Sequence, residues 1–76
     1  MSNTLYVDRM PSTISASEVK ELFEGVGQVV GCDVVVDGSK SKGFIEMSTE
    51  GEARMAVEQL DGTELDGKRI HVFQVV

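Results

Sequence analysis

Two helix-start signals of the same kind divide the chain and restrict its fold most strongly. Ser15 and Glu18 form an S-x-x-E capping box, and Thr49 and Glu52 form a second box of this type. A one-sided apolar stripe follows each box. The stripes are Val19, Leu22, Phe23 and Val26 after the first box, and Ala53, Ala56, Val57 and Leu60 after the second. We therefore predict one amphipathic helix after each box.

Short runs with the two-residue alternation of β-strands surround both predicted helices. These runs are Leu5–Asp8, Val29–Val36, the segment that begins at Lys40, and Arg69–Val75. Asp37-Gly38 is a strong turn signal that joins the second and third runs in a tight hairpin. The order βαββαβ predicts a ferredoxin-like α+β sandwich, in which a four-stranded antiparallel sheet carries both helices on one face. The other face stays open to water, and function is expected there.

Length and composition argue against several classes of protein. With 76 residues, we expect a single domain over residues 1–76. No apolar run is long enough for a membrane span, and the first ten residues lack the pattern of a secretory signal. One cysteine, Cys32, cannot form an internal disulfide, which favours a reducing, intracellular compartment. The sequence contains no ligand cluster and no nucleophile–base pair, so we expect no cofactor, no metal and no enzyme activity.

Three of the four aromatic residues belong to the predicted open face. Alternation assigns the following side chains to this face: Tyr6, Asp8, Asp33, Val35, Lys40, Lys42, Phe44, Glu46, His71 and Phe73. Exposed aromatic rings usually mark a contact surface. Rings beside lysines suit single-stranded nucleic acid, because rings stack on bases and ammonium groups meet phosphates. Arg9, where the first strand ends, is a candidate for a further phosphate contact.

The acidic composition does not exclude this ligand. The formal net charge is −6, which disfavours non-specific binding to phosphates. The predicted helical spans, 17–26 and 50–60, account for −4 of this charge, whereas the predicted open face carries −1. The acids on the open face, Asp8, Asp33 and Glu46, either accept hydrogen bonds from bases or repel phosphate. A nearly neutral face permits nucleic-acid binding but does not drive it.

The segments LYVDRM, from Leu5 to Met10, and KSKGFIEM, from Lys40 to Met47, carry a family resemblance. The first resembles the strand-one hexapeptide of the RNA recognition motif family, although Arg9 stands where the family usually has asparagine. The second resembles the family's octapeptide, K/R-G-F/Y-G/A-F-V-x-F/Y. The run MSTEGEARMAVEQLDGTELDGKRIHV is similar to the family's second helix and last strand. The resemblance extends from Thr4 to about Val75.

The octapeptide can be aligned in two registers. If it begins at Lys42, Glu46 occupies the place of the main stacking ring. If it begins at Lys40, Phe44 is an aromatic match, Glu46 takes the free place and Met47 ends the motif. Alternation cannot choose between registers that differ by two residues. The run that follows can, because it puts Met47 at the end of the octapeptide, so we predict the Lys40 register.

In this register the resemblance implies a partly degenerate binding face. Ser41 replaces the family's usual glycine and Lys42 replaces its first aromatic ring. Of three expected stacking rings, Tyr6 and Phe44 remain. The loop around Gly38 is also shorter than is usual in the family, which leaves little loop to enclose a bound strand.

The resemblance implies a single RNA recognition motif that binds short single-stranded RNA, with single-stranded DNA as a further candidate. The predicted binding residues are Tyr6 and Phe44 for stacking, Lys40, Lys42 and Arg9 for charge, and His71 and Phe73 for secondary contacts. The alternative is a protein-interaction domain that uses the apolar sheet face or the acidic helices. We expect a monomer without a membrane partner.

Overall fold

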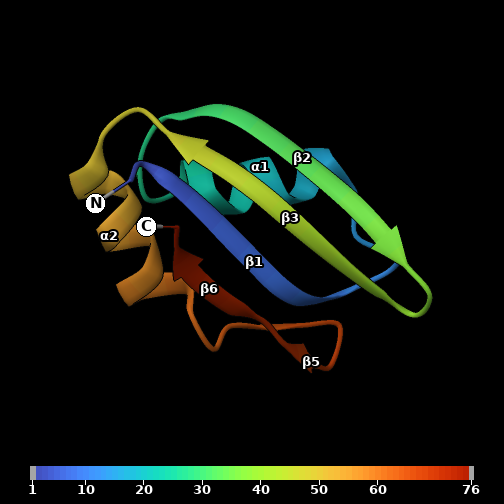
Figure 1. Ribbon diagram of the computed structural model, residues 1–76. Coiled ribbons are helices and arrows are strands. Elements are labelled where there is room, and N and C mark those ends of the chain that lie inside the picture. Colours follow the sequence, from blue (N-terminus) through green and yellow to red (C-terminus); the bar gives the residue numbers. More distant parts are fainter. Residues whose placement is uncertain (1, 76) are drawn as a thin grey trace.

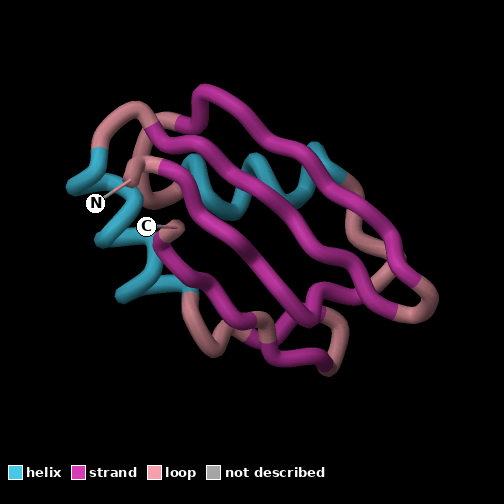
Figure 2. The backbone as a smooth tube through the Cα atoms, in the orientation of Figure 1, coloured by secondary structure: helices cyan, strands magenta, loops and turns pink. Residues whose placement is uncertain are grey.

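A four-stranded antiparallel sheet forms the centre of the molecule, with the strand order β2-β3-β1-β6 (Figure 1). The computed structural model describes residues 2–75. Its elements are β1 (Thr4–Pro11), α1 (Ala16–Glu24), β2 (Val29–Asp37), β3 (Lys40–Met47), α2 (Glu50–Leu60), β4 (Glu64–Leu65), β5 (Lys68–Arg69) and β6 (His71–Gln74). In the view of Figure 2, α1 passes behind the sheet and α2 lies at its left margin, so no helix covers the face towards the viewer. The predicted ferredoxin-like sandwich is confirmed.

The first helix begins as the sequence predicts. The Ser15 side chain accepts a hydrogen bond from the Glu18 amide over 3.2 Å, and the Ser15 amide donates to Glu18 Oε1 over 3.0 Å, which completes the capping box. The helix ends at Glu24, before the predicted Val26, because Gly25 caps it. Val26 still packs against the core from the segment beyond the helix.

The second capping box is only half formed. Thr49 Oγ1 accepts a hydrogen bond from the Glu52 amide, as predicted. The Glu52 carboxylate, however, accepts from the Gln28 amide over 3.1 Å and from Ser48 Oγ over 2.6 Å. A Cβ at Gly27 would lie 2.8 Å from this carboxylate, so only glycine at this position leaves enough room for the Glu52 side chain. Glu52 thus ties the start of α2 to the segment before β2.

The β2–β3 hairpin is tight, as predicted, and β2 extends one residue beyond the predicted run, to Asp37. Asp37 pairs with Lys40, so the two loop residues are Gly38 and Ser39. Gly38 has a φ of 67°, the conformation required at the first position of a type II′ turn.

The C-terminal third contains a hairpin that the sequence analysis missed. Strands β4 and β5 pair across Asp66-Gly67, whose φ angles of 48° and 82° fit a type I′ turn. The predicted strand Arg69–Val75 is therefore divided. Arg69 belongs to β5, Ile70 lies buried between the strands, and β6 begins at His71.

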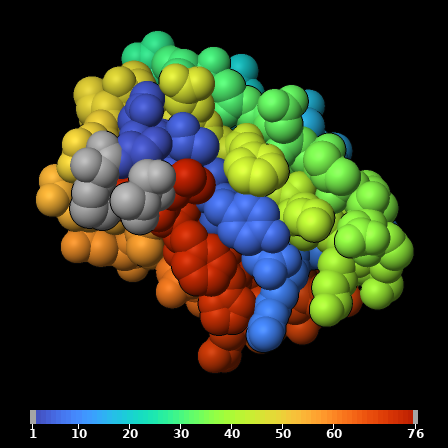
Figure 3. Space-filling model, in the orientation of Figure 1, coloured from blue at the N-terminus to red at the C-terminus, as the bar shows by residue number. Residues whose placement is uncertain are grey.

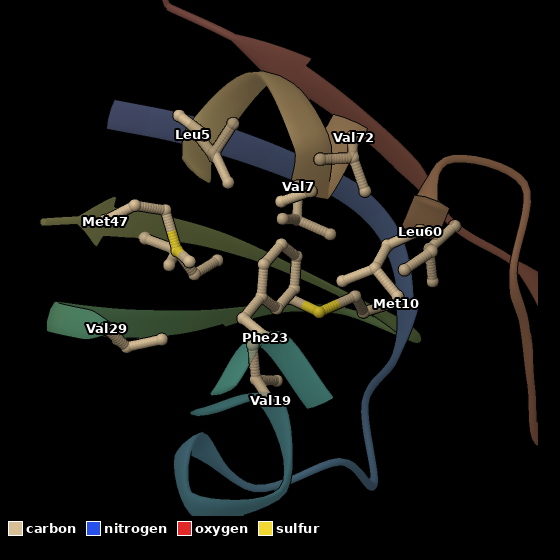
Figure 4. Packing of buried hydrophobic residues seen from close by; sticks show 13 residues of the cluster. Leu5, Val7, Met10, Val19, Phe23, Val29, Met47, Leu60 and Val72 are labelled. Atoms are coloured by element: carbon tan, nitrogen blue, oxygen red, sulfur yellow. The ribbon is translucent and has the colours of Figure 1, made fainter. Parts of the chain in front are cut away.

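The core lies between the sheet and the two helices. Its buried apolar residues are Leu5, Val7, Met10, Val19, Phe23, Val29, Ile45, Met47, Ala53, Ala56, Leu60, Ile70 and Val72. Figure 4 shows Phe23 pointing from α1 into the middle of this cluster. Because Asp33 and Val35 are assigned to the open face, alternation predicts Cys32 and Val34 in the core, but both are only partly buried, because β2 is an edge strand and they pack at the rim. Among residues 2–75, no helix has the length and apolarity needed to cross a membrane.

Candidate nucleic-acid interface

Four rings form a continuous band across the open face of the sheet. Tyr6 on β1 pairs directly with Phe44 on β3 and with Phe73 on β6. Its ring centroid lies 5.3 Å from that of Phe44, at an interplanar angle of 50°, and 6.1 Å from that of Phe73, at 22°. His71 continues the band along β6, stacked on Phe73 with centroids 5.9 Å apart. We call Phe44, Tyr6, Phe73 and His71 the ring band.

The outer rings of the ring band are well exposed. Phe44 is 47% exposed and Phe73 is 48% exposed, whereas Tyr6 is half-buried between them. In Figure 3 the blue atoms of β1 lie between the yellow-green atoms of β3 and the red atoms of β6 on this face. Exposed apolar surface of this kind marks a contact site. The ring contacts also hold the rings in place before any ligand arrives, which lowers the entropy cost of binding.

The band holds one ring more than the two-ring platform that the family resemblance implied. Phe73, predicted only for secondary contacts, stacks on Tyr6 at the same level as Phe44. The ring missing at Lys42 is thus replaced from the opposite side of β1. Lys42 faces outward, but it lies opposite the irregular segment of β1 and pairs with Val35 on β2.

The Lys40 register remains a prediction, in which Phe44 takes a stacking place and Glu46 a free place. Phe44 lies opposite Tyr6 at the centre of the sheet, whereas Glu46 lies opposite Thr4 near the end of the pairing and accepts a hydrogen bond from the Asn3 side chain over 3.4 Å. Gly43 faces the helices, where an added Cβ would lie 3.0 Å from the Met10 side chain and 3.3 Å from the Asp33 carbonyl oxygen. That crowding explains a small residue at this place.

The acids of the open face are arranged in different ways. Asp8 Oδ1 accepts a hydrogen bond from the amide of Arg9 over 2.8 Å, so one oxygen of this carboxylate is already engaged by the neighbouring backbone. Asp33 pairs across the strands with Phe44 and lies exposed beside that ring. Asp33 thus places a negative charge beside Phe44.

Strand β1 is irregular where it leaves the ring band. Its pairing with β3 passes from Val7–Gly43 to Met10–Ser41, so Asp8 and Arg9 together oppose one residue of β3. Arg9 has a φ of 62°, a left-handed conformation that is uncommon for residues other than glycine. Such a shift redirects a side chain at the end of a strand.

Two other chemical groups, one beside the ring band and one on the covered side of the sheet, do not form a site. His71 Nδ1 is 3.7 Å from Asp61 Oδ1, which also accepts a hydrogen bond from the Val72 amide. Burial, with a smaller contribution from Asp33, raises the pKa of the Cys32 thiol, so the thiol is protonated and weakly nucleophilic at neutral pH. Within residues 2–75 no group of three or more His, Cys, Asp or Glu side chains is arranged to hold a metal ion.

A comparison with models of protein families matches residues 5–71 to the RNA recognition motif. The chain belongs to the RNA recognition motif family. The match includes both strands that carry the predicted motifs, and it ends at His71, the first residue of β6.

Curated relatives match this chain over a part of their own, longer chains. Scaffold attachment factor B2 of Homo sapiens is 40% identical over 72 residues, which are 90% of this chain and 8% of that protein. The chloroplastic 28 kDa ribonucleoprotein of Spinacia oleracea is 38% identical over 72 residues, which are 90% of this chain and 31% of that protein. The chain thus spans less than a third of the length of these relatives.

Solved structures share the fold at low sequence identity. The Rna15 RNA recognition motif with bound RNA (GU) has a TM-score of 0.88 at 22% identity, covering 99% of this chain and 84% of that one. The Sxl-lethal protein/RNA complex has a TM-score of 0.90 at 22% identity, covering 100% of this chain and 48% of that one. At this identity the likeness establishes the architecture of the RNA recognition motif.

The structure brings most of the predicted site residues of this RNA recognition motif together and adds two. Tyr6, Phe44, Phe73 and His71 form one band, and Lys40, Lys42 and Arg9 lie towards the β2–β3 hairpin. Lys68 and Arg69 of β5 lie beside Arg9 and Lys40, although the sequence analysis assigned them no role. The dipeptide Asp66-Gly67, a strong hairpin signal, marked the turn that places them there.

Proposed function

We propose that this RNA recognition motif binds short single-stranded RNA on the open face of its sheet, with bases stacked on the ring band. The observation that carries the proposal is the direct row of Phe44, Tyr6 and Phe73 across three strands, with two of the rings about half exposed. Each base stacked on such a ring contributes about 1–3 kcal/mol and requires no particular sequence.

The charged residues have a supporting role in this proposal. Lys40 and Lys42 meet backbone phosphates beside the rings, Arg9 meets phosphate at the end of β1, and His71 adds a secondary contact. Stacking and phosphate contacts do not require the ribose 2′-hydroxyl, so single-stranded DNA is a further candidate ligand. The acidic residues near Phe44 limit the affinity, which we expect to be roughly micromolar or weaker in view of the overall charge.

Family membership and the relatives favour RNA over a protein partner. The curated relatives include a ribonucleoprotein and the chloroplastic RNA-binding protein CP31B of Arabidopsis thaliana, 36% identical over 72 residues, and the Rna15 motif was solved with RNA bound. We infer a binding module rather than an enzyme, in an intracellular compartment, that acts as a monomer. A protein partner on the same rings is the alternative that the experiment below distinguishes.

An NMR titration with a pool of short RNAs tests the proposal. We expect amide signals near Tyr6, Phe44 and Phe73 to move, because these residues contact the bases, and signals from Glu18 to Glu24 to stay, because α1 lies on the opposite side of the sheet. A pool of single-stranded DNA of the same lengths shows whether the 2′-hydroxyl matters. Shifts confined to the helices, or no shifts with either pool, would overturn the proposal and favour a protein partner.

A further inference from the structure

Four cationic side chains surround one hollow at the end of the sheet. Arg9 from β1, Lys40 from β3, and Lys68 and Arg69 from β5 line a cavity of about 320 Å³. Figure 3 shows a notch at the lower margin of the open face, between blue and yellow-green atoms, with red atoms behind it. We call this cavity the basic hollow. It depends on the topology, because its lining comes from three strands that are distant in sequence.

The cationic side chains of the basic hollow are unpaired among residues 2–75. None of its four side chains forms an ion pair or a side-chain hydrogen bond within the described part of the chain. No acidic residue lines it. With Lys42, it gathers five of the seven basic residues of a chain whose net charge is −6. Convergent, unpaired cations raise the local potential and attract an anion.

The backbone at Arg9 is strained in a way that serves the basic hollow. A left-handed φ is unfavourable for an ordinary residue, and asparagine or glycine would adopt it more readily. Arginine at this position retains the backbone strain but places a long cationic side chain beside Lys40. Strain of this kind is typical of functional positions.

The basic hollow is continuous with the ring band. Lys40 also lines a second hollow, of about 240 Å³, whose walls include Tyr6 and Lys42 together with the acids Asp8 and Asp37. Arg9 follows Tyr6 by three residues along β1, a separation of roughly 10 Å at the rise of a strand. A nucleic-acid strand that leaves Tyr6 towards this end of the sheet therefore meets the cations next.

We propose that the basic hollow holds a backbone phosphate of the RNA strand whose bases stack on the ring band. The inference rests on the proposed function and extends it. It adds Lys68 and Arg69 to the binding residues, and it specifies the end of the sheet towards which the RNA strand continues. A free phosphate or nucleotide offers the same anion, but the continuity through Lys40 favours the phosphate of a strand already bound at Tyr6.

A pair of charge-matched variants tests this assignment. Lys68→Ala/Arg69→Ala removes two cations from the basic hollow, and Lys20→Ala/Arg54→Ala removes two exposed cations from the helices. Both variants have the same net charge. With the short RNA chosen from the titration above, we expect roughly three- to tenfold weaker binding for the first variant at low salt and a much smaller loss for the second.

A second measurement uses the unaltered protein and so does not depend on the folding of a variant. Each phosphate of the RNA is replaced in turn by an uncharged methylphosphonate. One linkage, beyond the stacked bases, should weaken binding and reduce the log–log salt slope by about 0.7. The same replacement should have little effect in Lys68→Ala/Arg69→Ala, because the cations that it faces are already gone.

The outcomes separate the two proposals. If wild-type protein binds no RNA, the proposed function and the basic hollow both fail. If Tyr6→Ala weakens binding but the two charge variants bind equally, the ring band stands and the basic hollow is overturned. Equal effects of every methylphosphonate likewise overturn it. A titration with inorganic phosphate alone that shifts Lys68 and Arg69 as strongly as the RNA does would assign the hollow to a free anion instead.

Discussion

The ring band and the basic hollow occupy the same sheet but bind by different forces. The ring band is shallow and central, and its contacts with bases depend on stacking, which salt screens little. The basic hollow lies at one end and depends on unpaired charges, whose attraction for phosphate falls as salt rises. Affinity at high salt should therefore report the rings, and the additional affinity at low salt should report the cations.

The two regions also arise from different parts of the folding pattern. Regular pairing of β1 with β3 and β6 aligns the rings, and each ring stands on a strand that is hydrogen-bonded to its neighbour. The basic hollow arises where regular pairing stops, at the shifted register of β1 and at the β4–β5 hairpin. Its geometry should tolerate change less well than that of the band, since fewer hydrogen bonds hold it.

The largest expected effect is the loss of the central ring. Tyr6→Ala should weaken RNA binding by up to about 3 kcal/mol, because Tyr6 offers its own stacking surface and also positions Phe44 and Phe73. Phe44→Ala and Phe73→Ala should each cost about 1–2 kcal/mol. Tyr6→Phe is the matched control, which keeps the ring and should bind nearly as wild type. Fluorescence titration at high salt measures these differences, and equal losses for all three alanine variants would contradict a central role for Tyr6.

Adding a ring at Lys42 tests how far the band can be extended towards the basic hollow. Lys42→Phe should tighten binding, because a new stacking ring contributes about 1–3 kcal/mol, while the lost lysine reduces the salt slope by about one unit. RNA binding by this variant should therefore depend more on stacking and less on the salt concentration. Titrations with one RNA at two salt concentrations measure both changes.

Glu46→Phe is the comparison variant for that experiment. In the Lys40 register Glu46 occupies a free place near the end of the pairing with β1, so a ring there should add little. If Glu46→Phe tightens binding strongly and Lys42→Phe does not, the motif begins at Lys42 and our register is wrong by two residues.

Arg9 connects stability with charge in the basic hollow. Arg9→Asn should raise the free energy of unfolding by about 1 kcal/mol, because asparagine tolerates a left-handed φ, and should weaken RNA binding at low salt. Arg9→Lys keeps both the charge and the strain and serves as the control. Urea unfolding and RNA titration measure the two effects. Wild-type affinity in Arg9→Asn would remove Arg9 from the phosphate site.

The smallest effect is expected on the covered side, beneath both regions. The Ser41 hydroxyl is buried without a hydrogen-bond partner within residues 2–75, which costs stability. Ser41→Ala should raise the free energy of unfolding by up to about 1 kcal/mol and leave RNA affinity unchanged, because this side chain faces the helices. A loss of stability in urea would show that the hydroxyl is satisfied after all.

The ring band was largely predictable because strand alternation and one topological pattern define it. Tyr6, Phe44, Phe73 and His71 were all assigned to the open face from the sequence. The closeness of Phe73 to Tyr6 was not predicted, because it depends on β6 pairing with β1 rather than on either strand alone. Cys32 and Val34 were expected in the core, but a two-residue period gives no indication of whether a strand lies at an edge.

The basic hollow escaped prediction because its residues do not share a periodic element. Lys68 and Arg69 lie in a two-residue strand, too short for an alternation signal, and the left-handed turn of Arg9 leaves no trace in a pattern of apolar residues. Glu52 shows a related limit. The spacing correctly predicted the hydrogen bond from its amide to Thr49, but its carboxylate accepts from the Gln28 amide, a partner that only the tertiary structure brings near.

The two-residue loop Gly38-Ser39 has a consequence for how long a ligand stays. A longer loop could fold over a bound strand and would have to open before release, whereas this hairpin leaves the strand uncovered on the sheet. Dissociation then requires only that the contacts themselves break. With a roughly micromolar Kd and an association rate constant of about 10⁷ M⁻¹s⁻¹, a bound RNA would leave within about a tenth of a second. We therefore expect RNA to exchange quickly on this face, and durable retention would require further contacts made elsewhere on the RNA.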